Sequence, residues 1–300
     1  MSRTENNILL FSITLCWAAS YIFIKQLPSS LSDFAYLTMT CGIAAILLSI
    51  IFWKKFRQIT GTLIKKSFVL SLLLTLNLLF DKLGIDNLSS SVSSVFASSS
   101  ILIVPAIMIL MKKFPTRNNI AGALVIMAGI LTTNGFDYTN IFTPGAGYMF
   151  LSALTSSCYT IVVDKVSKEE DPLLLSIIQM WISAIISFAI WSVQEPSTFA
   201  SVEYSNEMLS SIFILAFFAK AYAYVALMYS QKYSDPVSVT IIASTEPVVT
   251  LVLAVLIPTA FEEQFTPASI AGAVIIMAGA IISGTDFLSC GKGGKISEAK

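Results

Sequence analysis

The stretch Ala121–Gly129 reads A-G-A-L-V-I-M-A-G, and 150 positions later Ala271–Gly279 reads A-G-A-V-I-I-M-A-G. Seven of the nine residues are identical, and each copy follows a short polar connection of the form Thr-x-x-x-Ile. Self-similarity at a fixed offset is the signature of a repeat architecture. Because the offset is half of the 300-residue chain, the sequence predicts two halves of one design.

Hydrophobic residues make up 55% of the chain and charged residues only 12%. Soluble domains carry roughly a quarter charged residues, so this composition is typical of an integral membrane protein. A membrane-spanning helix needs about 20 predominantly apolar residues. The sequence predicts an all-α integral membrane fold with ten transmembrane helices, at about 8–27, 34–53, 67–86, 92–111, 120–135, 145–163, 173–191, 208–229, 237–257 and 268–288.

The positions of the basic residues predict the orientation of these helices. With an intracellular N-terminus, the inside holds fifteen of the 18 basic residues: Arg3, Lys54, Lys55, Arg57, Lys65, Lys66, Lys112, Lys113, Arg117, Lys165, Lys168, Lys232, Lys292, Lys295 and Lys300. The opposite loops after the fifth, seventh and ninth helices hold acidic residues instead: Asp137, Glu195, Glu203, Glu262 and Glu263. Basic residues near span ends favour the cytoplasmic side, so both termini are predicted to be cytoplasmic.

Five helices per half have a topological consequence. An odd number makes the second half enter the membrane from the opposite side, so the halves form inverted repeats, as in many secondary transporters. The predicted units are a first five-helix repeat at 1–143, a second, inverted one at 144–290 and a disordered tail at 291–300. Alternating access needs such symmetry, because two similar halves can exchange inward and outward roles.

Several other functions are disfavoured by what the chain lacks. It has no histidine, the commonest metal ligand and proton shuttle. Its four cysteines, Cys16, Cys41, Cys158 and Cys290, are scattered singly and fit neither a disulfide framework nor a zinc site. Basic and acidic residues both number 18, so net charge indicates no nucleic-acid partner. We expect no cofactor, no metal and no enzymatic activity.

The order of short motifs resembles the EamA branch of the drug/metabolite transporter superfamily, over nearly the entire chain. The motifs are Trp17 to Lys25 in the first helix, Gly84-Ile85, the Ser-rich turn from Ser89 to Ser94, Val104-Pro105, Glu246-Pro247, Glu262 and Gln264 before Thr266-Pro267, and the final G-A-x-x-I-x-x-G. Two departures stand out. Ala18 replaces the glycine that is usual in the family, and Pro105 to Gly122 is eight residues shorter than Pro247 to Gly272.

The resemblance implies a secondary carrier of a small organic metabolite in the lipid bilayer, with export of an amino acid or related solute as the commonest role. Uptake or exchange of a nucleotide-type metabolite is an alternative, and a non-transporting sensor or scaffold is another. The chain has no G-x-x-x-x-G-K-[ST] loop, so ATP hydrolysis within it is excluded. Compact loops and the charge bias fit a bacterial inner membrane, with an organelle membrane as the alternative.

Two charged residues lie deep in predicted spans, where a charge is costly and marks a candidate functional site. Lys220 and Glu246 both lie roughly 14–15 Å from the inner ends of their helices at 1.5 Å per residue. Their equal depth predicts a pair, which either borders the transport cavity or locks the helices. Glu246 is also the candidate for proton coupling, because burial raises the pKa of a carboxylate.

Polar and aromatic residues complete the expected cavity. Asn77 and Asp81 share a helix face, as do Trp17 and Tyr21, and aromatics with polar tips suit an organic solute. The predicted solute-binding residues are Trp17, Tyr21, Asn77, Asp81, Ser98, Tyr159, Lys220, Tyr222 and Glu246. The repeated stretches have another role: Gly122 and Gly129 share a face, as do Gly272 and Gly279, and permit close helix packing. Their helices are expected to form a scaffold or a homodimer surface.

Overall fold

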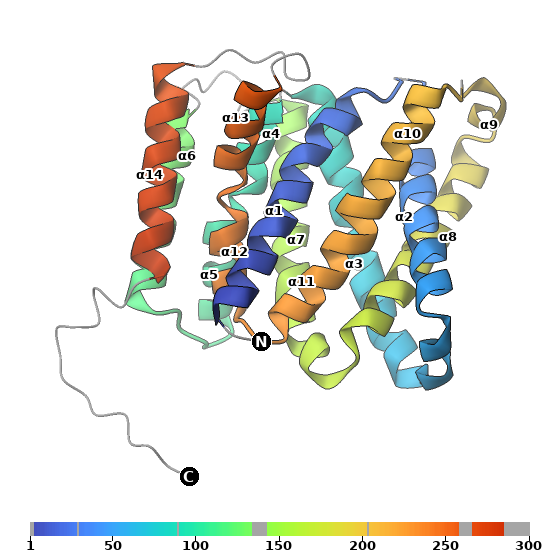
Figure 1. Ribbon diagram of the computed structural model, residues 1–300, viewed down its shortest axis with the longest axis horizontal. Coiled ribbons are helices and arrows are strands. Elements are labelled where there is room, and N and C mark those ends of the chain that lie inside the picture. Colours follow the sequence, from blue (N-terminus) through green and yellow to red (C-terminus); the bar gives the residue numbers. More distant parts are fainter. Residues whose placement is uncertain are drawn as a thin grey trace, which may run out of the picture.

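The computed structural model describes residues 3–28, 30–88, 90–133, 143–202, 204–257 and 266–284, and these form helices without any strand (Figure 1). In chain order they are α1 (Arg3–Lys25), α2 (Asp33–Ile51), the short η1 (Trp53–Gln58), α3 (Gly61–Asn87), α4 (Ser90–Ala97), α5 (Ser100–Leu110), α6 (Arg117–Thr133), α7 (Pro144–Glu169), α8 (Pro172–Gln194), α9 (Thr198–Ser201), α10 (Asn206–Ile214), η2 (Leu215–Tyr222), α11 (Ala223–Gln231), α12 (Pro236–Ala243), α13 (Glu246–Leu256) and α14 (Pro267–Gly284). Four predicted loop acids, Cys290 and the predicted tail lie outside the described residues: Asp137, Glu203, Glu262, Glu263 and 291–300.

Seven helical stretches of the described chain are long and apolar enough to cross a membrane. They are Thr4–Lys25, Asp33–Ile51, Gly61–Asn87, Pro144–Glu169, Pro172–Gln194, Asn206–Gln231 and Pro236–Leu253. Three shorter apolar helices accompany them, at Ser100–Leu110, Arg117–Thr132 and Pro267–Ser283. The prediction of an all-helical protein that passes the membrane several times is confirmed.

Helix starts follow local capping chemistry. The pairs Thr143-Pro144, Asp171-Pro172 and Asp235-Pro236 each place a capping side chain before a proline at the first helical turn. The capping oxygen accepts a hydrogen bond from a backbone N–H of that turn. Proline is well placed there because its missing N–H has no partner within the helix. These three caps fix where α7, α8 and α12 begin.

Ion pairs connect the two halves at the lower edge of the bundle in Figure 1. Lys55 of η1 pairs with Asp171, the N-cap of α8, and Lys66 of α3 contacts Glu169 at 2.8 Å and Glu170 at 2.6 Å. Burial alone would raise the pKa of Asp171, but the Lys55 ammonium and backbone N–H donors hold it below its ordinary value. The hydrogen bond to Asp171 in turn raises the pKa of Lys55.

The two copies of the repeated stretch pack against each other. They lie on α6 and α14, which stand side by side at one end of the molecule (Figure 1). A Cβ on Gly129 would lie 2.7 Å from the backbone nitrogen of Ile276, and one on Gly279 would lie 2.8 Å from that of Ile126. This reciprocal contact covers the glycine faces within one chain. Of the two expected roles the contact fits the scaffold, and a homodimer would have to use the outward sides of these helices.

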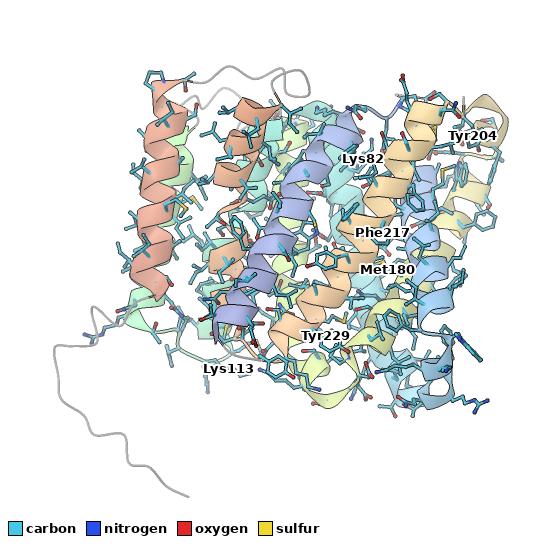
Figure 2. All side chains as sticks on the ribbon, viewed as in Figure 1. Lys82, Lys113, Met180, Tyr204, Phe217 and Tyr229 are labelled. Carbon is cyan, nitrogen blue, oxygen red and sulfur yellow. The ribbon has the colours of Figure 1, made fainter. Side chains whose placement is uncertain are left out.

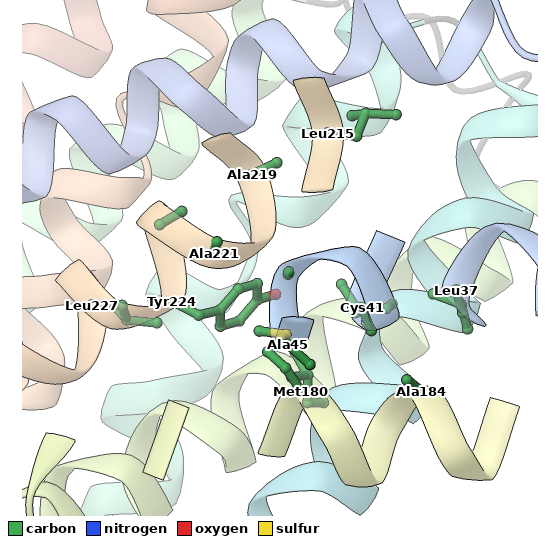
Figure 3. Close-up of a cluster of buried hydrophobic side chains, with 14 of the residues drawn as sticks. Leu37, Cys41, Ala45, Met180, Ala184, Leu215, Ala219, Ala221, Tyr224 and Leu227 are labelled. Atoms are coloured by element: carbon green, nitrogen blue, oxygen red, sulfur yellow. The ribbon is translucent and has the colours of Figure 1, made fainter. Parts of the chain in front are cut away.

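A second group of buried side chains holds the opposite end together. In Figure 3, Leu37 and Cys41 of α2 face Met180 and Ala184 of α8, with Tyr224 of α11 close by. All five are buried, and α2 packs along α8 as α3 packs along α7. The expectation that the cysteines are buried apolar side chains holds for Cys41, while two others, Cys16 and Cys158, are half-buried. Each of these helix pairs joins the two halves.

Two helices are interrupted at corresponding places. α4 and α12 both have 8 residues, two non-helical residues follow, and α5 and α13 both have 11. The interruptions are Ser98-Ser99 and Ser244-Thr245, and they lie against each other, since the Ser244 hydroxyl lies 3.4 Å from the Ser98 carbonyl oxygen. The shorter stretch noted after Pro105 therefore does not shorten the helix. Four of the eight residues lie in the connections, 111–116 against 257–266, and the other four arise because Pro105 is the sixth residue of α5 whereas Pro247 is the second of α13.

Candidate solute-binding cavity

A cavity of ≈ 110 Å³ lies where the two interrupted helices meet. Both halves line it, through α1, α3, α4 and α5 from the first and α7, η2, α11, α12 and α13 from the second. Eight of the nine predicted solute-binding residues are on its wall: Trp17, Tyr21, Asn77, Asp81, Ser98, Tyr159, Lys220 and Glu246. The structure thus brings them to one place, and solute binding by them stays a prediction.

The ninth residue, Tyr222, is not on that wall. Its hydroxyl lies 2.7 Å from the Ser12 hydroxyl on α1, and the residue is 38% exposed. Tyr224 lines the cavity instead. The reason is helical geometry, because a residue two positions from Lys220 points to the opposite side of the helix, whereas one four positions away shares its face.

The two deep charges do not pair with each other. Both Lys220 and Glu246 are more than 90% buried, but neither forms an ion pair with any described residue. The carboxylate that acts electrostatically on Lys220 is that of Asp81 on α3. Glu246 interacts with the Tyr21 hydroxyl of α1. The expected Lys220–Glu246 pair is therefore wrong.

The side chains of Asn77 and Asp81 meet α7 across the cavity wall. The Asn77 amide donates hydrogen bonds to the carbonyl and hydroxyl oxygens of Ser152 at 3.0 and 2.9 Å. The Ser152 hydroxyl lies 3.4 Å from the Asp81 carboxylate. The predicted polar strip exists, and it also packs α3 on α7. Ser152 was missing from the prediction because nothing in the sequence shows which serine of α7 faces Asn77.

Three aromatic rings from three helices share one side of the cavity. The Tyr224 ring centroid lies 5.8 Å from that of Trp17 and 6.0 Å from that of Tyr159. The Tyr159 hydroxyl donates to the Gln179 side chain of α8 at 3.0 Å, which fixes the ring. Tilted and edge-on contacts of this kind are the arrangements that aromatic rings prefer. The cluster presents a firm apolar surface beside the charged groups.

Lys220 lies in an irregular part of its helix. Residues Leu215–Tyr222 form the π-helical segment η2 within the continuous rod of α10 and α11. Such segments are rare and occur frequently at functional sites. The Lys220 ammonium lies 5.8 Å from the centroid of the buried Tyr36 ring, close enough for a cation–π contact. The aromatic face attracts the buried ammonium but leaves its charge in place, whereas a carboxylate would neutralise that charge.

Within the described residues, no three histidine, cysteine or acidic side chains come together to hold a metal ion. The cavity wall has two carboxylates, one ammonium, an amide, hydroxyls and four aromatic rings. Such a wall can recognise a small organic molecule that combines polar and apolar parts.

Comparison with known proteins identifies the family. The EamA-like transporter family matches residues 6–135 and 143–285, one segment in each half of the chain. A protein of known crystal structure shares the fold with a TM-score of 0.74 at 17% identity, over 94% of this chain and 98% of that one. No curated protein matches the sequence. The chain belongs to the EamA-like transporter family, whose members are membrane transporters of the drug/metabolite transporter type.

Proposed function

We propose that this protein is a secondary-active carrier that moves a small organic metabolite by alternating access. The observation that carries the proposal is the cavity at the junction of the two interrupted helices. Broken helices in corresponding positions of two repeats are the best structural pointer to the substrate site of a transporter. Here both breaks meet at one cavity, which both halves line.

Alternating access rests on ten crossings in two inverted five-helix repeats. In chain order, the five helical rods of the first half are α1, α2, α3, α4–α5 and α6, and those of the second half are α7, α8, α10–η2–α11, α12–α13 and α14. The first, third and fourth rods of each half line the cavity, whereas the second and fifth rods do not. The second rods pack on each other and so do the fifth rods. A two-fold axis through the cavity would produce this pattern, and it supports the proposed units 1–143 and 144–290.

Both termini are proposed to be cytoplasmic. α1 begins and α14 ends at the lower edge of the bundle in Figure 1. Figure 2 places Lys113 at that same edge, which also holds the ion pairs of Lys55 and Lys66. Basic residues at the span ends favour the cytoplasmic side, so this edge would face the cytoplasm. The predicted bacterial inner membrane is retained as the location.

The proposed solute is a small zwitterion such as an amino acid or a related metabolite. Asp81 and Glu246 offer carboxylates to an ammonium group, and Lys220 offers an ammonium to a carboxylate. The three aromatic rings suit an apolar side group. A volume of ≈ 110 Å³ fits a solute of this size and is below the 300–1,000 Å³ typical of sites for drug-sized ligands. Export is the proposed direction.

The test is binding followed by flux. The melting temperature of the purified protein is measured with amino acids, nucleotides, polyamines and organic cations. A ligand that binds only the folded form stabilises by about 2.7 kcal/mol at a hundredfold excess over its Kd. A hit is then tested in liposomes loaded with unlabelled ligand. Trans-stimulated uptake of labelled ligand is expected, and binding without trans-stimulation would instead identify a sensor.

The same liposomes test proton coupling through Glu246. A pH gradient without any solute gradient is expected to drive net flux if the carboxylate carries a proton during the cycle. Flux that depends only on solute exchange would agree with the proposed carrier and contradict proton coupling through Glu246. Reversing the solute gradient across oriented vesicles measures the preferred direction.

A further inference from the structure

A second pocket lies at the lower edge of the bundle, away from the central cavity. It has a volume of ≈ 400 Å³ and is lined by the inner ends of α3, α5 and α7 together with Pro236. Figure 2 shows Lys113, one of its residues, at this edge. The pocket shares no residue with the solute-binding cavity. It therefore needs an explanation of its own.

The pocket carries an excess of unpaired positive charge. Three lysines line it, and its two acids are each held by a lysine, Asp164 by Lys168 at 2.5 Å and Glu169 by Lys66 at 2.8 Å. Lys113 and Lys165 form no ion pair with any described residue and have exposed side chains. Two ammonium groups are thus free to bind an anion at the mouth of the pocket.

The backbone before Lys113 has an unusual conformation. Lys112 has a φ of 60°, in the left-handed region that side chains other than glycine rarely adopt. The Lys113 N–H donates to the Met108 carbonyl at 2.9 Å, which closes the end of α5 in the pattern usually built on glycine. This turn stops the helix and brings Lys113 to the rim beside Met108 and Met111.

An exposed apolar surface rises from the pocket towards the middle of the bundle. On α3, Val69 lines the pocket, and Leu72 and Leu76 continue its face one and two turns further on. Their side chains are 50%, 47% and 36% exposed. On the adjacent α7, Leu154 and Leu151 extend the face of Ile161 in the same direction and are also exposed. An apolar chain can lie along these two rows.

We propose that this pocket binds an anionic glycerophospholipid. The phosphate ester is bound by Lys113 and Lys165, and an acyl chain lies on the α3 and α7 rows. Basic pockets between helices at the cytoplasmic side are a recognised way of binding anionic headgroups. A soluble phosphate would match the lysines equally well, but it would leave the apolar rows without a function, so the lipid accounts for both features.

The experiment compares lipid retention in matched charge variants. The full-length protein is equilibrated at about 0.15 M salt in micelles with equal amounts of phosphatidylglycerol and phosphatidylcholine, and retained lipid is counted by native mass spectrometry. At that ionic strength the Debye length is about 8 Å, so distant lysines are screened. We expect wild type to retain phosphatidylglycerol preferentially. In Lys113→Gln/Lys165→Gln the preference should fall about fivefold per lysine.

The control is Lys54→Gln/Lys65→Gln, which removes the same charge from exposed residues of the same edge outside the pocket. It should keep the wild-type preference. Glu169→Gln removes one of the two acids that contact Lys66 and makes the pocket more positive, so it should raise the preference, a change that partial unfolding could not produce. An equal fall in both double variants, or no fall in the pocket variant, would overturn the site. Displacement by a large excess of inorganic phosphate would overturn the lipid and leave a soluble-anion site.

Discussion

Among the pairs of corresponding helices that meet across the proposed two-fold axis, two meet in different ways. α6 and α14 are unbroken and contact each other through glycines at backbone distance. α4–α5 and α12–α13 are interrupted, and their junction holds polar groups and a cavity. Both contacts join corresponding positions of the two halves that match the family. The first is built to stay closed, and the second has the open space and polar groups that a moving junction requires.

Glu246 marks where the two interrupted helices stop being alike. It is the first residue of α13, and Ser100 holds the same place in α5. The two helices therefore have equal lengths, while only one of the two corresponding positions carries a charge. An asymmetric charge in a symmetric frame would let the carrier present the same cavity to both sides and still bind one orientation of the solute.

The largest expected effect comes from Glu246→Gln at the polar junction. A hydrogen bond to a charged group contributes about 1.5–3 kcal/mol, so transport should fall roughly 10- to 100-fold. The melting temperature should not fall, because a charge within a span is costly in itself. Flux in liposomes and thermal unfolding measure the two effects. Glu207→Gln, at the exposed start of α10, is the matched control. A large loss of stability in Glu246→Gln would make this residue structural.

Gly129→Leu tests the closed contact and should behave in the opposite way. Its side chain would enter space held by the backbone of α14, and overpacking of this kind typically costs about 1–3 kcal/mol. We expect a lower melting temperature, with transport per folded molecule largely kept. Gly147→Leu is the control, since a Cβ there meets nothing within 4 Å. Equal melting temperatures for the two variants would contradict the close packing.

Asp171→Asn should have the smallest effect and provides a baseline outside both contacts. Asparagine keeps the capping oxygen and removes only the charge that pairs with Lys55, so the loss should stay below about 1 kcal/mol. The pKa of Asp171 is lower in the folded protein than in the unfolded chain. The ionised carboxylate therefore contributes its full stabilisation at pH values above the unfolded-state pKa, and this contribution is lost as the pH falls through the folded-state pKa. Melting curves of wild type and variant should therefore converge in acid, and curves that remain parallel would exclude the ion pair.

The sequence predicted the architecture well because its signals are periodic and repeated. The apolar runs and the copies at Ala121–Gly129 and Ala271–Gly279 indicated a multi-pass helical protein in two halves, which the structure and the family match confirm. The interruptions at Ser98-Ser99 and Ser244-Thr245 were not predicted. Serine and threonine are ordinary residues within apolar helices. Pro247 follows the second break in the first turn of α13, but no proline or glycine stands at the corresponding place after the first break.

Partners across the cavity were the weakest part of the prediction. Depth along the helix placed Lys220 and Glu246 at one level in the membrane. Depth does not determine on which side of its helix each side chain lies. The structure places the Lys220 ammonium over the Tyr36 ring. Lys25 at the end of α1 donates to the carbonyl oxygens of Ile85 in α3 and of Leu88, the C-cap of α3, the latter at 2.7 Å, and nothing in the sequence indicated these partners. The choice of Tyr222 over Tyr224 could have been avoided from the four-residue spacing to Lys220 alone.

The glycine contact between α6 and α14 also bears on how the chain is made. Ile126 and Ile130 of α6 are buried in a cluster with Ile276, a residue synthesised about 150 positions later. At about 5–20 residues per second, α6 waits in the membrane for roughly 10–30 s before its partner emerges from the ribosome. During that interval its small-residue face is open to lipid and to other nascent helices. α14, which is made after the other described helices, thus covers the glycine face of the first half.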